Sequence, residues 1–230
     1  SARAPACRHP SASDDISATP SLDSDPTFRL SSTRWCKEMD YKPEVFREQF
    51  PVLKRFVYHL TYYRELNAVY RRLELKSEFW THTIDAHLLQ AAIHWCMVFG
   101  SHGCNPTHWK NLSDSESEKL EQSFRDGLSK ETGLTTAGWQ KYWDAMNNFR
   151  GKYAAHRELN FCEPVPDFTS ALKVAYYYDQ WIRDVISPDI FEEPPLEKSA
   201  VALRESVTPL INHLLEDTKK QAGKLWSESV

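Results

Sequence analysis

The hydrophobic positions from residue 51 onward have the spacing of amphipathic helices. In the first predicted helix, apolar side chains recur every three or four residues and share one face, namely Leu53, Phe56, Leu60, Tyr63, Leu66, Tyr70 and Leu73. A second stretch with this spacing runs from Ser77, a suitable N-cap, to Gly100, a suitable C-terminal stop. We expect the first helix to begin at Pro51 and the two helices to form an antiparallel hairpin.

Further helical segments follow, separated by stretches that contain Gly or Pro. One covers 115–124 with an acidic first turn, one starts near Thr136 and continues through Tyr153, one is capped by Asp167, and the last spans roughly 196–222. There is neither an internal repeat nor a period-2 alternation long enough for a sheet. The sequence therefore predicts an all-α, antiparallel bundle of about five or six helices, in one domain over residues 41–225.

The first 40 residues differ from this pattern. They carry Ser, Ala, Pro and Asp in short alternations and almost no large apolar groups. Such a stretch cannot bury enough surface to offset its conformational entropy. We expect a disordered N-terminal arm, or a leftover of cloning, and assign it no function.

Composition and charge narrow the class of protein. The chain has 230 residues, of which 41% are hydrophobic and 13% aromatic, so we expect a globular protein with a ring-rich core. Its net charge of −4 offers no long-range attraction to nucleic acid, and RNA would therefore need a local basic patch. No apolar run is long enough for a membrane span or a signal peptide, which predicts a cytoplasmic protein without a membrane partner. Five widely spaced cysteines indicate reduced thiols, and without a Gly-rich phosphate loop we expect no cofactor.

The candidate chemistry lies in residues 147–157, Asn-Asn-Phe-Arg-Gly-Lys-Tyr-Ala-Ala-His-Arg. An arginine grips phosphate oxygens through two N–H groups, and a histidine exchanges a proton near neutral pH. Arg150 and His156 could thus catalyse, without metal, the attack of an RNA 2′-hydroxyl on the neighbouring phosphodiester. In an unbroken helix they would lie about 120° apart, so a kink or helix end near Gly151 would be needed to join them. The alternative is a packed core histidine, because His156 would share the apolar stripe of Tyr142, Phe149 and Tyr153.

The spacing from Arg150 to His156, with Phe149, Tyr153 and the run Tyr-Ala-Ala-His-Arg, resembles the R-x(4–6)-H motif of the HEPN superfamily. That superfamily is helical, and many of its members are metal-independent RNases that serve as toxins or in phage defence. The helices around the motif also suit a HEPN bundle, so the resemblance covers roughly residues 45–190. It implies a homodimer in which Arg150 and His156 of both subunits line one cleft, where Arg150 positions the scissile phosphate and His156 transfers the proton.

Four further residues of the segment complete the predicted site. We expect Asn147, Lys152, Tyr153 and Arg157 to contact the RNA, with Lys152 and Arg157 adding positive charge. Many active HEPN members have Asn, Asp or His directly after the motif arginine, whereas this chain has Gly151. A polar contact would then have to come from Asn147 or Asn148, one turn earlier.

Two alternatives stay open beside this interpretation. His94, Cys96, His102, Cys104 and His108 offer ligand chemistry for Zn²⁺, but their spacing matches no familiar zinc pattern, and we predict no metal site. The function hypotheses are a HEPN-like endoribonuclease or RNA-binding protein, of a toxin–antitoxin or phage-defence system with an antitoxin partner, and a catalytically inactive helical module that binds another protein.

Overall fold

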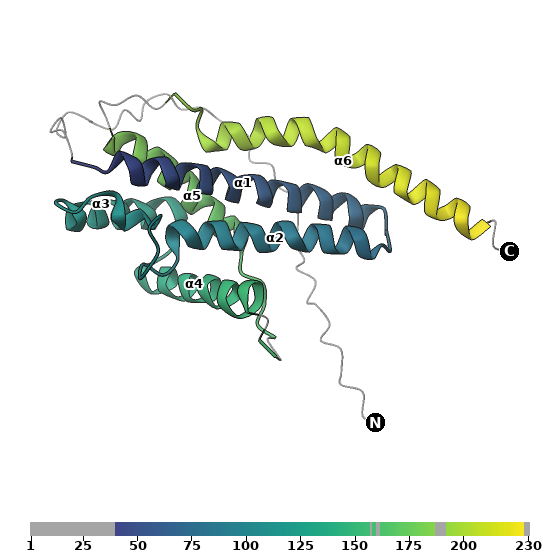
Figure 1. Ribbon diagram of the computed structural model, residues 1–230, viewed down its shortest axis with the longest axis horizontal. Coiled ribbons are helices and arrows are strands. Elements are labelled where there is room, and N and C mark those ends of the chain that lie inside the picture. Colours follow the sequence, from purple (N-terminus) through teal and green to yellow (C-terminus); the bar gives the residue numbers. More distant parts are fainter. Residues whose placement is uncertain (1–39, 157, 160–161, 187–191, 228–230) are drawn as a thin grey trace.

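The computed structural model describes residues 40–156, 158–159, 162–186 and 192–227, and within them helices are joined by loops and no strand occurs (Figure 1). The six α-helices are α1 (Pro43–Arg72), α2 (Glu78–Phe99), α3 (Ser117–Thr132), α4 (Thr136–Asn148), α5 (Phe168–Val185) and α6 (Leu196–Ser227). A short 3-10 helix, η1 (Trp109–Leu112), precedes α3, and a π-helical segment, η2 (Phe149–Ala155), follows α4. The predicted all-α bundle is thereby confirmed. The prediction for the N-terminal arm falls, except for residue 40, outside the described residues.

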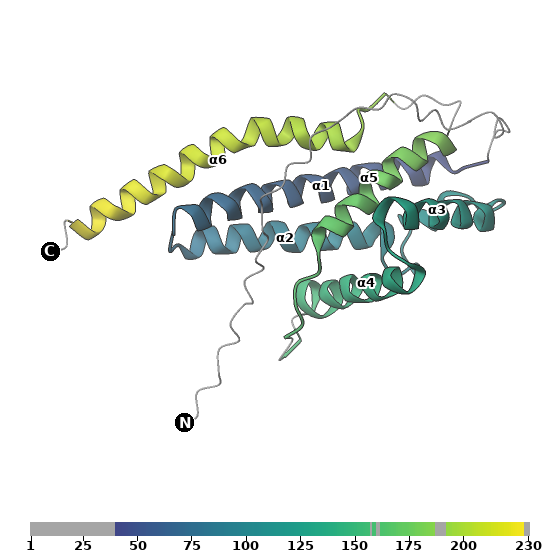
Figure 2. The same ribbon diagram turned by 180° about the vertical axis from the view of Figure 1, so that it is seen from behind.

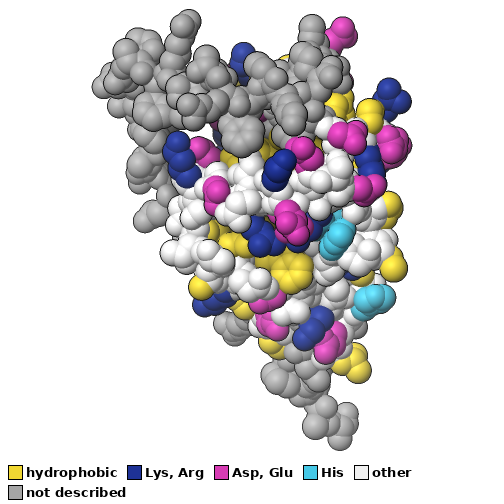
Figure 3. Space-filling model, turned by 90° about the vertical axis from the view of Figure 1, so that its left-hand side faces the viewer, with side chains coloured by type: hydrophobic (Ala, Val, Ile, Leu, Met, Phe, Trp, Pro, Cys, Tyr) yellow, Lys and Arg dark blue, Asp and Glu magenta, His cyan; other side chains and the backbone are white. Residues whose placement is uncertain are grey.

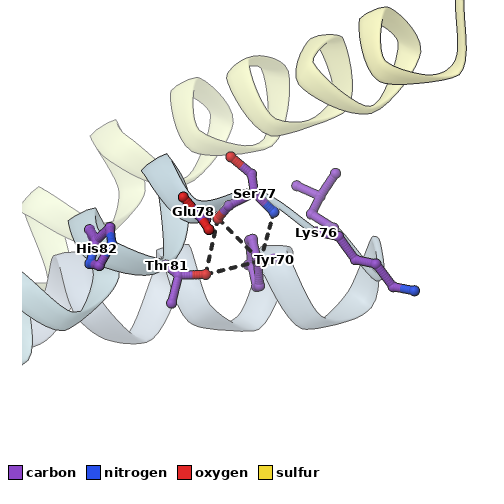
Figure 4. Close-up of a pocket in the computed structure, with 7 residues that line it drawn as sticks. Tyr70, Lys76, Ser77, Glu78, Thr81 and His82 are labelled. Carbon is purple, nitrogen blue, oxygen red and sulfur yellow. Dashed lines mark hydrogen bonds between the residues drawn. The ribbon is translucent and has the colours of Figure 1, made fainter. Parts of the chain in front are cut away.

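The first two helices form the predicted antiparallel hairpin (Figures 1 and 2). At its turn, the Tyr70 hydroxyl accepts a hydrogen bond from the Ser77 backbone N–H at 3.1 Å and bonds the Thr81 hydroxyl at 3.1 Å. Figure 4 shows these side chains around an open hollow at the turn. The Ser77 hydroxyl accepts from the N–H of Trp80, which confirms the predicted N-cap, and Gly100 ends α2 as expected.

The start of the first helix differs from the prediction. α1 begins at Pro43, and the N–H of the preceding Lys42 donates to the Leu112 carbonyl at 2.7 Å. The expectation that Pro51 begins the helix is therefore wrong, because Pro51 lies inside α1. A proline inside a helix removes one backbone hydrogen bond. Its ring is exposed, however, while the flanking Phe50 and Val52 are buried, and this packing continues the helix across it.

Two hydrophobic clusters hold the bundle together. The larger joins α1, α2, α3 and α5 and is rich in rings, as predicted: Trp95, Phe99, Phe124 and Tyr178 are fully buried. The smaller lies beneath α6, which packs along α1 and extends past the turn of the hairpin (Figure 2). None of the helices in the described ranges combines the length and apolar character needed to cross a membrane.

Two buried polar groups fix the ends of elements. The carboxylate of Asp179 on α5 accepts from the Leu196 N–H at 2.8 Å and pairs with Arg183, so it anchors the start of α6. His108 fixes the loop after α2: its Nε2 bonds the Gly100 carbonyl at 3.1 Å, and its Nδ1 accepts from the Lys110 N–H at 3.2 Å. Burial lowers the pKa of His108 to about 4, and the ring is therefore neutral near pH 7.

Candidate functional site

The helix α4 is fixed to its neighbours and positions the segment 147–157. The Thr135 hydroxyl caps its first turn by accepting from the Gly138 N–H at 3.1 Å. Farther along, the Trp143 indole N–H donates to the Phe99 carbonyl at 2.7 Å, and the Tyr142 hydroxyl donates to the Asp167 carbonyl at 2.8 Å. α4 is thus bound to the end of α2 and to the start of α5.

The backbone widens over the motif itself. From Phe149 to Ala155 the chain is a π-helix, and the His156 N–H donates to the Gly151 carbonyl at 3.0 Å, five residues earlier. The next bond, from the Glu158 N–H to the Lys152 carbonyl at 2.7 Å, closes the end of this turn. Short π-helical segments are rare in proteins as a whole, but they are found frequently at functional sites. The helix irregularity expected near Gly151 therefore takes the form of a π-helical turn that ends at Ala155.

Arg150 faces the interior of the bundle. It is half-buried, and its guanidinium contacts the thiol of Cys96 on α2. The Cys96 sulfur also lies 3.8 Å from the Met146 carbonyl. Burial raises the pKa of Cys96 to about 12, although the charge of Arg150 acts in the opposite direction. Cys96 therefore stays a protonated thiol and is no nucleophile at neutral pH.

His156 lies at the exposed end of the turn. Its side chain is exposed, and its backbone, with φ −129° and ψ 62°, leaves the helix. The alternative of a packed core histidine is therefore wrong, because the chain departs from the apolar stripe of α4 before it reaches residue 156. Within the described part of one chain, Arg150 is turned toward Cys96, and no hydrogen bond joins it to His156.

The structure divides the four predicted substrate contacts. Lys152 is exposed, with its ammonium 3.7 Å from the Glu158 carboxylate, and Tyr153 is half-buried and stacked on Phe149 at 5.2 Å between ring centroids. Asn147 is bound within the α2–α4 junction, since its amide donates to the Trp143 carbonyl at 2.9 Å and its carbonyl oxygen lies 3.3 Å from the Ser101 hydroxyl. Arg157 lies outside the described residues.

The residue after Arg150 has room for a side chain. A Cβ built on Gly151 would meet no atom within 4 Å apart from its own turn and its chain neighbours. Of the two asparagines one turn before Gly151, Asn148 is exposed and Asn147 is half-buried. Asn148 is therefore the accessible one of the two asparagines that the sequence offers as polar partners for the motif.

An aromatic hollow lies between α3 and α4, and sequence reasoning missed it. Its walls include Trp109, Trp139 and Trp143, and its rim carries Lys110 and Arg125. Both cations bond the Glu121 carboxylate, at 2.8 and 3.0 Å. Figure 3 shows hydrophobic side chains exposed on this end of the molecule, next to basic, acidic and histidine side chains. Trp109 lies on η1, whereas Trp139 and Trp143 lie on α4, about 30 residues later, so no local sequence pattern could have indicated the hollow.

The histidines and cysteines considered for zinc have different neighbours. His94 stacks on His59 of α1, Cys96 contacts Arg150, and both ring nitrogens of His108 are bound to backbone groups. Over the described residues, no three side chains of His, Cys, Asp or Glu are grouped so as to hold a metal ion.

Comparison of the chain with family models, with curated proteins and with solved structures finds no match. The resemblance to the HEPN superfamily therefore rests on the residues of the motif and on the helical setting in which they occur.

Proposed function

We propose that this protein is a HEPN-like, metal-independent endoribonuclease that binds single-stranded RNA at the end of α4 and η2. The observation that carries the proposal is the exposed imidazole of His156, at the end of a π-helical turn that contains the half-buried Arg150 and the exposed Lys152. A general acid or base must reach its substrate, and His156 meets this requirement.

The proposed reaction uses the RNA's own 2′-hydroxyl. His156 removes the proton from this hydroxyl, whose oxygen attacks the adjacent phosphorus. The bond from phosphorus to the 5′-oxygen breaks, and that oxygen takes up a proton, which leaves a 2′,3′-cyclic phosphate and a free 5′-hydroxyl. Arg150 offers five N–H donors. Its contact with the Cys96 thiol leaves donors for the phosphate oxygens whose charge grows during attack.

A second copy of the chain completes this site in the proposal. Within one chain, Arg150 is turned toward α2 and His156 is exposed at the end of η2. The motif of one chain therefore supplies a single accessible imidazole. A two-fold dimer would place two such turns side by side, so that one His156 acts as base while the other protonates the leaving oxygen.

The aromatic hollow supports the choice of an unpaired strand as substrate. Trp143 lies seven residues before Arg150 on continuous helical backbone, a distance of about 10 Å along the axis. Bases of a single strand stack on exposed aromatic rings, and such stacking does not depend strongly on sequence. A strand whose phosphate lies at Arg150 could thus place a nearby base on Trp139 or Trp143.

The test is cleavage of end-labelled single-stranded RNA in EDTA by the full chain, by His156→Ala and by His82→Ala. His82 is also exposed but lies near the start of α2, which makes it a matched control. We expect the wild type and His82→Ala to cleave equally and His156→Ala to lose at least about 100-fold in rate. Equal cleavage by all three, or none by the wild type, would remove the enzymatic proposal.

The alternative is a catalytically inactive helical module that binds another protein. The observation in its favour is the inward position of Arg150, which employs the guanidinium in the packing of α4 on α2. A wild-type protein that binds no RNA and cleaves none in the same assay would support it.

A further inference from the structure

Three histidines meet between α1 and α2, away from the candidate RNA site. His59 of α1 and His87 of α2 approach with their Nδ1 atoms 2.9 Å apart. On its other side, the ring of His59 stacks on His94, with centroids 5.4 Å apart and planes 9° from parallel. All three rings are half-buried. We call this group the histidine cluster.

The distance between the two Nδ1 atoms limits how many protons the cluster can hold. A hydrogen bond of 2.9 Å needs an N–H on one ring and a bare nitrogen on the other. A protonated imidazole carries a hydrogen on both nitrogens. His59 and His87 can therefore keep this bond when one ring is charged, but two charged rings would oppose one N–H to the other.

The surroundings of the histidine cluster do not compensate for added charge. The other titratable or charged groups that bear on it are Arg55, one turn before His59, and Tyr62, whose ring contacts both His59 and His87. Among the described residues, no carboxylate contributes to the charge that the three rings experience. On the remaining side, Nδ1 of His94 donates to the Gln90 carbonyl at 2.8 Å. This bond raises the pKa of His94, but burial, which lowers it, has the larger effect.

We propose that the histidine cluster is a pH-sensitive contact between α1 and α2. It holds the two helices together while at most one ring is charged, and it weakens their packing when a second proton binds. Because α1 and α2 form the hairpin on which α4 and α6 pack, acid loosens the platform of the whole bundle. The inference does not depend on the proposed RNA chemistry.

The direction of the effect follows from proton linkage. Burial lowers the pKa of all three rings, and that of His59 falls to about 4, with further lowering by His87, His94 and Arg55. The folded chain then binds fewer protons than the unfolded chain, in which a histidine has a pKa near 6.5. The stabilisation is fully present above about pH 6.5 and is lost as the pH falls toward about 4.

The experiment is thermal unfolding of the full chain at pH 7.5 and 5.0, followed by circular dichroism, for the wild type, His59→Gln and His82→Gln. We expect the Tm of the wild type to fall by about 2–4 °C more than that of His59→Gln over this interval. His82→Gln leaves the cluster intact and should show the wild-type fall. Equal falls for the wild type and His59→Gln would overturn the proposal.

A second measurement keeps the proposal testable if His59→Gln does not fold. Histidine ring signals of the wild type are titrated by NMR between pH 7.5 and 4.5. We expect one ring of the His59–His87 pair to stay neutral below pH 5.5. Midpoints near 6.5 for His59, His87 and His94 alike would contradict it.

Discussion

The loop that carries His108 and the turn that carries His156 both follow a helix of the same bundle, yet the two histidines have opposite surroundings. Both ring nitrogens of His108 are bound to backbone groups, and the residue is 2% exposed. His156 is exposed at the end of η2, and none of the elements in the described part of the chain covers its ring. The two rings therefore differ in whether their nitrogens are bound within the protein or open to solvent, and the proposed chemical role of His156 requires an open ring.

The largest expected effect separates the two histidines by stability. His108→Ala leaves the Gly100 carbonyl and the Lys110 N–H without partners and removes a buried ring, which should cost about 3 kcal/mol of unfolding free energy. His156→Ala removes an exposed side chain and should change that free energy by less than about 0.5 kcal/mol. Urea unfolding followed by tryptophan fluorescence measures both. Similar losses for the two variants would break the comparison.

The next effect concerns the two roles assigned to Arg150. Arg150→Met keeps an unbranched chain against Cys96 but removes the charge, so we expect a loss of roughly 100-fold in RNA cleavage with stability changed by less than about 1 kcal/mol. Arg72→Met, a surface arginine at the end of α1 that pairs with Glu216, is the control and should retain cleavage. Should Arg150→Met cleave like the wild type, the guanidinium would have a packing role alone.

A gain of function is expected at the residue after Arg150. The space around Gly151 accepts a side chain, and many active members of the HEPN superfamily, which the motif resembles, have Asn, Asp or His there. Gly151→Asn should raise cleavage several-fold and stabilise the turn by about 0.5 kcal/mol, because glycine loses more backbone entropy on folding. Gly151→Ala gives the same backbone effect without the amide and serves as the matched control. An equal change in rate for both variants would assign the gain to the backbone.

The smallest effect tests the start of the helix that follows the segment. The Asp167 carboxylate accepts from the N–H groups of Thr169 and Ser170, at 2.8 and 3.1 Å. Asp167→Ala should lower the free energy of unfolding by about 1 kcal/mol, whereas Asp167→Asn should lower it much less, because asparagine is also a good N-cap. Chemical denaturation distinguishes the two, and equal losses would indicate that the cap contributes through its charge.

Much of the fold could be predicted from local sequence, because helix formation depends on spacing and caps. Apolar residues at steps of three and four predicted α1, α2 and α5, and the caps Ser77 and Asp167 were placed correctly because a short polar side chain preceded each apolar stretch. Pro51 was misjudged for a tertiary reason. The burial of Phe50 and Val52 holds α1 together across it, and this burial is not visible in the sequence.

The candidate site could be predicted less well. The segment, the special position of Gly151 and the chemistry of Arg150 and His156 follow from residue types. The orientation of the Arg150 side chain depends on Cys96, which lies 54 positions earlier. The π-helical turn depends on backbone hydrogen bonds between residues five apart. The histidine cluster depends likewise on the register of α1 against α2. The spacing of His87 and His94 by seven residues was its one local signal, since it places both rings on the same face of α2.

The account is tested most directly by the requirement for a 2′-hydroxyl. The measurement compares a single-stranded RNA with the same strand made of DNA, both incubated in EDTA with the wild type and with His156→Ala, and identifies the product ends. We predict cleavage of the RNA alone, by the wild type alone, with a 2′,3′-cyclic phosphate on one product. Cleavage of the DNA, a linear 5′-phosphate product, or undiminished cleavage by His156→Ala would contradict the account.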